Sequence, residues 1–339
     1  MALGAPNSKN GKIVSMSNQA LKRVIFTGLF LIPFVPFLVS GSLFFPFITT
    51  KAFVFRTIVE IIFGAWILLA MANREYRPQR SKVFYALGIF LVVIGVADLF
   101  GMAPVKSFWS NFERMEGYIT LLHLGALYLV MGTVFRAREW RSWWNTSLAA
   151  SVLMIVYCLF QLAGVVQIHQ GGVRVDGTLG NAAYLALYFL IHIFVASRFV
   201  VKTKDQTLKW MYGALILFQV LILYLTATRG AILGLLGGVF VIAVINIFNK
   251  ENMKARQWGV GALVALVVLS TGFIAIRDSV FVKGSPVLSR LGSISLSEWK
   301  TEGRSFVWAM ALKGIKEKPL LGWGQDNFNY VFAEHYSAK

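Results

Sequence analysis

Long runs of apolar residues, separated by short polar segments, occupy most of the chain between residues 24 and 276. A helix needs about 20 mostly apolar residues to cross the hydrocarbon core of a membrane. The pattern predicts spans at residues 24–41, 52–72, 83–102, 118–135, 147–168, 182–200, 210–227, 231–248 and 258–276. The apolar stretch around Thr228, Arg229 and Gly230 is too long for one span, so we expect a hairpin there. The expected fold class is therefore all-α: a polytopic transmembrane bundle of about nine helices.

Composition supports a membrane protein over a soluble one. The chain is 57% hydrophobic and only 14% charged, whereas about a quarter of the residues in a soluble domain are charged. Its net charge of +18 would suggest nucleic acid in a soluble chain. Here the basic residues flank apolar runs, so we expect the lipid bilayer as a partner and no nucleic acid. The single cysteine, Cys158, lies inside an apolar run, and no metal or other cofactor is expected.

Basic residues divide unequally between the two sides of the predicted bundle. One side carries Lys9, Lys12, Lys22, Arg23, Arg74, Arg77, Arg80, Lys82, Arg136, Arg138, Arg141, Arg198, Lys202, Lys204, Lys209, Lys250, Lys254 and Arg256. The other side carries Lys51, Arg56, Lys106, Arg114, Arg174 and Arg229. Basic residues concentrate in cytoplasmic loops, so we expect a cytoplasmic tail at 1–23, a transmembrane bundle at 24–276 and an outer segment at 277–339.

The expected outer segment contains an amphipathic pattern. Residues 303–318 predict a helix, with Met310 and Gly314 on its apolar face. Pro319 should end it, and Gly322-Trp323-Gly324 should form a turn. The simplest position for this helix is along the membrane surface.

Ionisable residues inside the apolar runs are costly and therefore informative. Glu60 lies in mid-span, one helical turn after Arg56, so the two are expected to form an ion pair, with a direct role in a site as the alternative. Asp98, near the outer end of its span, is expected to reach the interface. His123 and His192 are expected to be hydrogen-bonded packing residues.

Arginines recur at the outer ends of predicted spans, beside glycine turns. Arg174 precedes Gly177–Asn181, Arg229 lies at the tip of the predicted hairpin, and Arg304 begins the amphipathic helix. Arginine presents a fixed fork of donors that matches phosphate oxygens. Each residue alone could reach toward lipid headgroups, but the recurrence on one face favours an anion site.

Several of these stretches, taken together, match the motifs of a known family. Gly177–Asn181, Thr228-Arg229-Gly230, Gly303–Trp308 and Pro319–Phe328 resemble the O-antigen ligase/polymerase family of bacterial membrane glycosyltransferases. Pro46-Phe47-Ile48, Lys51, Phe55-Arg56 and Glu60 also look like the opening of one bacterial branch of this family. The resemblance extends through essentially the whole chain.

The resemblance implies a metal-independent, inverting glycosyltransferase in the bacterial inner membrane, active on its periplasmic side. Its partners would be a glycan linked to undecaprenyl diphosphate and an acceptor glycolipid, polysaccharide or protein. Arg229 and Arg304, with Arg174 as a weaker candidate, would bind the diphosphate. Lys51, Arg56 and Glu60 would support the site.

The catalytic residue is not assigned from the sequence. In the family, a His-Asn pair follows the glycine-rich outer segment, and its histidine is the base for the acceptor. His335 is not followed by Asn and comes too soon, so this role is not transferred to it. The chain is therefore expected to be an N-terminal portion of a longer protein.

Two other functions compete with the transferase. A transporter or flippase of anionic or lipid-linked sugar substrates could use Glu60 and the arginines as a pathway, but no pair of related discontinuous helices is evident. A peptidoglycan glycosyltransferase of the shape-determining class would share the lipid carrier, but no motif of that class occurs here.

Overall fold

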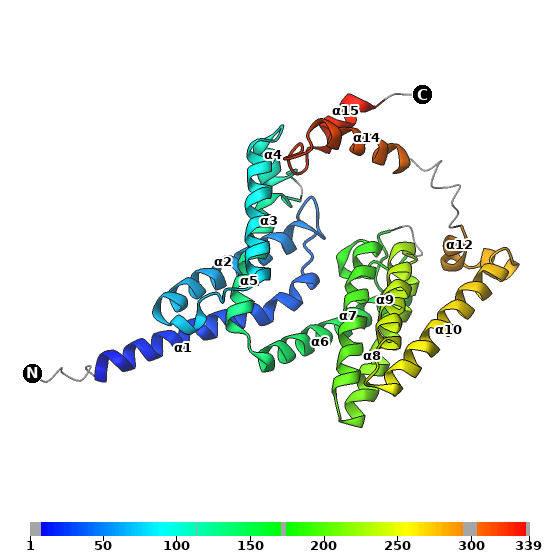
Figure 1. Ribbon diagram of the computed structural model, residues 1–339, viewed down its shortest axis with the longest axis horizontal. Helices are drawn as coiled ribbons and strands as arrows, with labels where there is room; N and C mark the ends of the chain where they lie inside the picture. Colours follow the sequence, from blue (N-terminus) through cyan, green and yellow to red (C-terminus); the bar gives the residue numbers. More distant parts are fainter. Residues whose placement is uncertain (1–7, 113, 171–173, 294–303, 337–339) are drawn as a thin grey trace, which may run out of the picture. The chain divides into compact units, whose positions relative to one another are not determined.

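The computed structural model describes residues 8–112, 114–170, 174–293 and 304–336 (Figure 1). Within these ranges the regular elements are all helices. In chain order they are α1 (Ser8–Leu31), η1 (Ile32–Phe37), α2 (Thr49–Ala72), η2 (Arg74–Tyr76), α3 (Lys82–Leu99), α4 (Pro104–Trp109), α5 (Tyr118–Val134), α6 (Ala137–Leu162), η3 (Gly177–Leu179), α7 (Ala182–Lys202), α8 (Gln206–Leu225), α9 (Arg229–Ile247), α10 (Met253–Ile276), α11 (Val280–Gly284), α12 (Pro286–Gly292), α14 (Arg304–Glu317) and α15 (Phe328–His335).

Each predicted span corresponds to an apolar helix, but two bounds differ: α6 occupies Ala137–Leu162 where 147–168 was predicted, and α1 begins at Ser8, inside the expected tail at 1–23. In the described part of the chain, eight helical segments are long and apolar enough to cross a membrane, namely Asn18–Phe37, Thr49–Ala72, Lys82–Leu99, Ala137–Leu162, Ala182–Lys202, Gln206–Leu225, Arg229–Ile247 and Met253–Ile276. The shorter apolar helix α5 occupies the remaining predicted position. A helix satisfies its backbone hydrogen bonds internally, as the bilayer core requires. The all-α polytopic membrane fold is confirmed.

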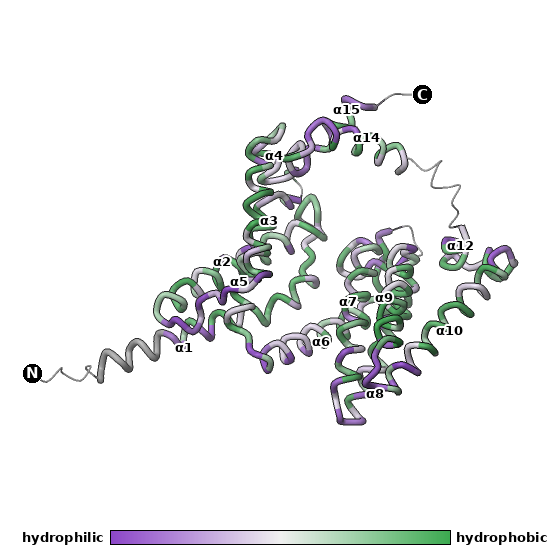
Figure 2. Tube along the Cα trace, in the orientation of Figure 1, coloured by the Kyte–Doolittle hydropathy of each residue, from purple (hydrophilic) through white to green (hydrophobic). Residues whose placement is uncertain are grey.

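These helices expose more apolar side-chain surface than is stable in contact with water. Only 6% of the most apolar window of α3, and 6% of that of α10, is buried. Figure 2 shows the hydrophobic colour running along α9 and α10. Large exposed apolar surfaces on a protein mark contact with a membrane or another protein. Contact with lipid explains them here.

The chain forms two compact units, and each is described by itself. The first contains residues 1–146 and 299–339. Its apolar core joins Ile25 and Leu29 of α1 to Ile62 and Leu69 of α2 and to Val130 of α5. The α1–α2 approach is very close, because a Cβ on Gly28 would lie 2.3 Å from the Ile62 side chain.

The second unit contains residues 147–298. In it α7 packs along α8, and α9 packs along α10. Two polar contacts tie its apolar helices together: Ser147 Oγ lies 2.9 Å from His192 Nε2, and Gln219 Nε2 donates to Ser151 Oγ at 2.9 Å. His192 Nδ1 also bonds Tyr188 O, so the expectation that this histidine is a hydrogen-bonded packing residue is met.

The outer helix and the hairpin also agree with the sequence. The predicted hairpin break falls between α8 and α9, at Thr226–Thr228. The predicted amphipathic helix is α14, in which Met310 is buried, and it ends before Pro319. Gly322 and Gly324 then adopt positive φ angles of 68° and 85°, which suit glycine in a tight turn. Gly303 lies outside the described residues.

Candidate functional site

Arg229 begins α9, directly after the α8–α9 turn in the second unit. The turn is tightly packed, because Thr226 is fully buried and Ala227 is 4% exposed. Ala227 adopts φ +49°, a left-handed conformation that costs a non-glycine residue about 1–2 kcal/mol. The first N–H groups of a helix lack partners within it and favour anions. The N-terminus of α9 and the cationic side chain of Arg229, its first residue, therefore both favour an anion at this position.

Arg174 holds this turn from a different segment of the same unit. Its Nε donates to Thr226 O at 3.0 Å, and its Nη2 donates to Thr228 Oγ1 at 3.2 Å. The Thr228 hydroxyl in turn donates to Ala182 O at 3.3 Å. Burial and, second, the positive charge of Arg290 lower the pKa of Arg174. Arg174, on which the charge of Arg290 acts, thus brings positive charge to the turn.

A buried carboxylate anchors the segment that carries Arg174. Asp176 is fully buried, and its Oδ1 accepts from Gln161 Nε2 at 2.7 Å. Its Oδ2 accepts from His169 N at 2.9 Å and lies 3.6 Å from His169 Nδ1. Gly177 N donates to Gln161 Oε1 at 2.8 Å. A buried charge needs such partners, so this network fixes the backbone just after Arg174.

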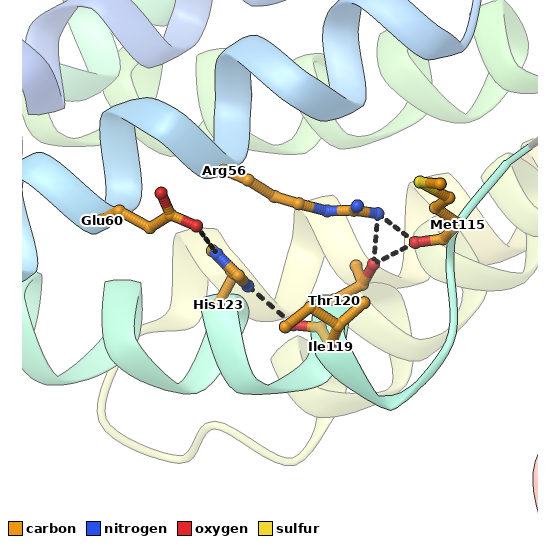
Figure 3. Close-up of polar contacts among 6 residues, drawn as sticks. All are labelled: Arg56, Glu60, Met115, Ile119, Thr120 and His123. Carbon is orange, nitrogen blue, oxygen red and sulfur yellow. Dashed lines mark hydrogen bonds and ion pairs between the residues drawn. The ribbon is translucent and has the colours of Figure 1, made fainter. Parts of the chain in front are cut away.

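Arg56 and Glu60 lie on α2 in the first unit, and both contact α5 or the residues just before it (Figure 3). Arg56 Nη2 donates to Met115 O, and to Thr120 Oγ1 at 3.0 Å. Glu60 Oε1 lies 3.1 Å from His123 Nε2. Each side chain therefore reaches across to a neighbouring segment.

The expected ion pair between Arg56 and Glu60 is not formed: among the described contacts, no Arg56 nitrogen lies within 4.0 Å of a Glu60 oxygen. Arg56 is 7% exposed, whereas the Glu60 side chain is 66% exposed, so the two point into different surroundings. The spacing permitted a pair, but polar groups before and within α5 are the partners instead.

Lys51 lies in the first turn of the same helix. Its Nζ donates to Phe47 O at 2.7 Å and stands 5.7 Å from the centre of the Phe47 ring. These contacts link the first turn of α2 to Phe47 in the loop before it.

The outer segment of the first unit folds back on α14. Trp323 Nε1 donates to Gly314 O at 2.9 Å, and Lys318 Nζ lies 4.1 Å from the centre of the Trp323 ring. His335 Nε2 lies 3.0 Å from Glu317 Oε1. His335, to which no catalytic role was transferred, is therefore engaged with α14.

Asp98, near the end of α3, contacts the outer segment of the chain. It is 5% exposed, and its Oδ1 accepts from Gln325 N at 2.6 Å. Ser107 Oγ donates to Gln325 O at 2.8 Å and accepts from Asn327 Nδ2 at 2.9 Å. Neither Ser107 nor this use of Asp98 has a signal in the sequence, because both depend on segments far apart in the chain.

The predicted site residues fall into three groups. Arg174 and Arg229 meet at the α8–α9 turn of the second unit. Lys51, Arg56 and Glu60 lie along α2 in the first unit, and Arg304 begins α14 of that unit. Arg290 is an addition that no motif marked. Among the described residues, no group of three or more His, Cys, Asp or Glu side chains could hold a metal ion.

Comparison with known proteins identifies part of the chain. Residues 213–339 match the family model described as O-antigen ligase. No curated protein and no solved structure gave a match. The matched part contains Arg229, α14 with Arg304, and the glycine-rich turn; Gly177–Asn181 and the stretch at 46–60 lie outside it, so their resemblance stays a prediction. This multi-pass membrane protein therefore carries, in residues 213–339, a domain of the O-antigen ligase family.

Proposed function

We propose that the protein transfers a glycan from undecaprenyl diphosphate to an acceptor hydroxyl on the periplasmic side of the bacterial inner membrane. Glycan transfer in general follows from the O-antigen ligase domain. The lipid donor, the acceptor (a glycolipid, a polysaccharide or a protein) and the orientation are the proposal. The uneven distribution of basic residues supports the orientation.

The proposed reaction is a direct displacement without a metal ion. The acceptor oxygen attacks the anomeric carbon of the sugar, the bond from that carbon to the diphosphate oxygen breaks, and the configuration inverts. The electron pair goes to the leaving diphosphate, and the acceptor proton goes to a base. Fixed positive groups at the diphosphate lower the barrier most. We do not assign the base to His335, because no asparagine follows it in the sequence.

One observation carries the proposal: Arg229 follows a turn that another arginine holds in a fixed conformation. Arg174 bonds this turn through two nitrogen atoms. The turn is followed at once by the start of α9, which is 19 residues long. Arg304 is the first residue of α14. We assign Arg229 and Arg304 to the diphosphate, with Arg174 as a weaker candidate and Lys51, Arg56 and Glu60 as supporting residues.

Arg229→Lys and Arg304→Lys test this assignment. Lysine keeps the charge but cannot form the bidentate fork. Each variant should bind undecaprenyl diphosphate roughly tenfold more weakly, a loss of about 1.4 kcal/mol. Binding is measured with purified protein in nanodiscs in the presence of EDTA, and transfer with a lipid-linked glycan.

Arg277→Lys is the matched control, because Arg277 is half-exposed and pairs with its neighbour Asp278. It should bind the carrier like the wild type. If Arg229→Lys and Arg304→Lys both bind and transfer like Arg277→Lys, these residues are not diphosphate ligands.

A further inference from the structure

We infer that the end of α3 and the start of α4 form a receptor that positions the outer segment of the O-antigen ligase domain. This α3–α4 corner comprises residues 98–107, which lie outside the matched range 213–339. Its ligand is the segment 322–329, inside that range. The corner thereby positions α14 and the backbone of Arg304, and this last step depends on the function proposed for Arg304.

The corner satisfies both backbone polar groups of one residue in the outer segment. Gln325 N donates to Asp98 Oδ1 at 2.6 Å, and Gln325 O accepts from Ser107 Oγ at 2.8 Å. Asn327 Nδ2 then donates to Ser107 Oγ at 2.9 Å. Hydrogen bonds to a carboxylate are about twice as strong as neutral ones. A buried carboxylate and a buried hydroxyl are therefore both used to hold a distant loop.

Gly101 and Gly324 let the two backbones approach to van der Waals contact. Met102 N donates to Trp323 O at 3.0 Å. A Cβ on Gly101 would lie 2.8 Å from Trp323 O and 2.9 Å from Gly324 Cα. Any side chain at Gly101 would therefore push the outer segment away, because the colliding atoms are backbone. Gly88, in α3, has no atom within 4 Å of its ideal Cβ position.

The docked turn is also fixed to α14 by side-chain contacts. Trp323 bonds Gly314 O at 2.9 Å, and a Cβ on Gly314 would lie 2.7 Å from the Val331 side chain. The C-terminal half of α14 is thus fixed to the docked turn and to α15. A helix of 14 residues is about 21 Å long. A tilt of about 10° at this end would move the Arg304 backbone by about 4 Å, and displacements of about 1 Å can already cost a hundredfold in rate.

Chemical cross-linking measures the docking without any substrate. Lys106 Nζ and Asn329 Oδ1 are 2.7 Å apart at the edge of the contact, and both side chains are exposed. Lys106→Cys with Asn329→Cys, in a Cys158→Ala background, gives a thiol pair for a short bismaleimide. Gly101→Ala should lower the cross-linked fraction several-fold, and Gly88→Ala should leave it unchanged.

Asp98 provides a second variant pair in case Gly101→Ala does not accumulate. Asp98→Asn keeps an oxygen that can accept from Gln325 N, so it should cross-link almost like the parent protein. Asp98→Ala removes that acceptor and should cross-link several-fold less. Parent-level cross-linking in both Gly101→Ala and Asp98→Ala would overturn the receptor role of the corner.

Binding of undecaprenyl diphosphate tests the link to Arg304. Asp98→Ala should weaken binding about as much as Arg304→Lys does, and the cross-linked fraction of Asp98→Ala should regain parental affinity. A general loss of folding would not be rescued in this way. Weak cross-linking with unchanged carrier binding would refute the positioning of Arg304. If the parent protein binds no carrier, the proposed function fails, while the cross-linking still decides whether the corner is a receptor.

Discussion

His123 Nε2 lies 3.1 Å from Glu60 Oε1, while His123 Nδ1 lies 2.7 Å from the carbonyl oxygen of Ile119. A carbonyl oxygen can only accept, so Nδ1 carries a proton and donates it. The contact with Glu60 therefore contains one further proton, held by either the imidazole or the carboxyl group. In both cases the pair is neutral as a whole, which lowers the cost of a carboxyl group in an apolar helix.

Arg56→Gln should destabilise the protein more than Glu60→Gln. Arg56 is buried and donates to Met115 O and Thr120 Oγ1, and without it Met115 O keeps only the 3.3 Å bond from Thr120 Oγ1, at a cost of about 1–3 kcal/mol. Glutamine at position 60 can still donate to a neutral His123, at a cost below about 1 kcal/mol. Thermal unfolding of the purified variants in one detergent gives the comparison.

The double variant separates this arrangement from a direct ion pair. If Arg56 and Glu60 neutralised each other, replacing both would be less harmful than replacing either one. We expect the Arg56→Gln, Glu60→Gln double variant to be at least as unstable as Arg56→Gln. A double variant more stable than both single ones would restore the ion-pair interpretation.

Arg174→Lys should loosen the α8–α9 turn. Lysine cannot reproduce the bonds from Nε and Nη2 to Thr226 and Thr228, so we expect a loss of about 1–2 kcal/mol in stability. Carrier binding should weaken with it, because the turn precedes Arg229. Arg290→Lys is the control: no hydrogen bond from the Arg290 side chain occurs in the described part of the chain. Equal stability of the two variants would contradict the role of Arg174.

Asp176→Asn should destabilise the second unit. One carboxylate oxygen accepts from Gln161 and the other from His169, so an amide group in place of either oxygen faces a donor. The expected cost is about 1–3 kcal/mol, seen as a lower melting temperature. Asp278→Asn, whose native side chain is 80% exposed, should melt like the wild type. An unchanged melting temperature for Asp176→Asn would show that the network contributes nothing.

Membrane orientation can be tested with reporter fusions. We expect a reporter that is active only in the periplasm to be active after Ser285, between α11 and α12, and silent after Lys204, between α7 and α8. The reverse pattern would put Arg229 on the cytoplasmic side and remove it from the proposed site.

The helices could be predicted from the sequence because their cause is local. Apolar runs of membrane-spanning length fix the spans, and Pro319 indicates where the amphipathic helix α14 ends. The short helices α4, α11, α12 and α15 were not predicted, because runs of five to eight residues carry too little periodic signal.

The candidate site was predicted less completely, because its partners are distant in the chain. The spacing of Arg56 and Glu60 indicated a pair, but it could not reveal that Met115 and His123 offer closer partners. The contact of Asp98 with Gln325 joins positions 227 residues apart. Such contacts depend on how helices pack, which no local pattern records.

That separation also sets an order of events during synthesis. A chain emerges from its N-terminus, so α3 and α4 are made long before Gln325, which follows Asp98 by 227 residues. The α3–α4 corner is therefore already in the membrane before the ribosome has synthesised the loop that it binds. A substitution at Asp98 or Gly101 would therefore not act while the earlier spans are being inserted, because the contact forms only after Gln325 has been made. Its effect would appear only later, when the loop that contains Gln325 fails to bind the α3–α4 corner.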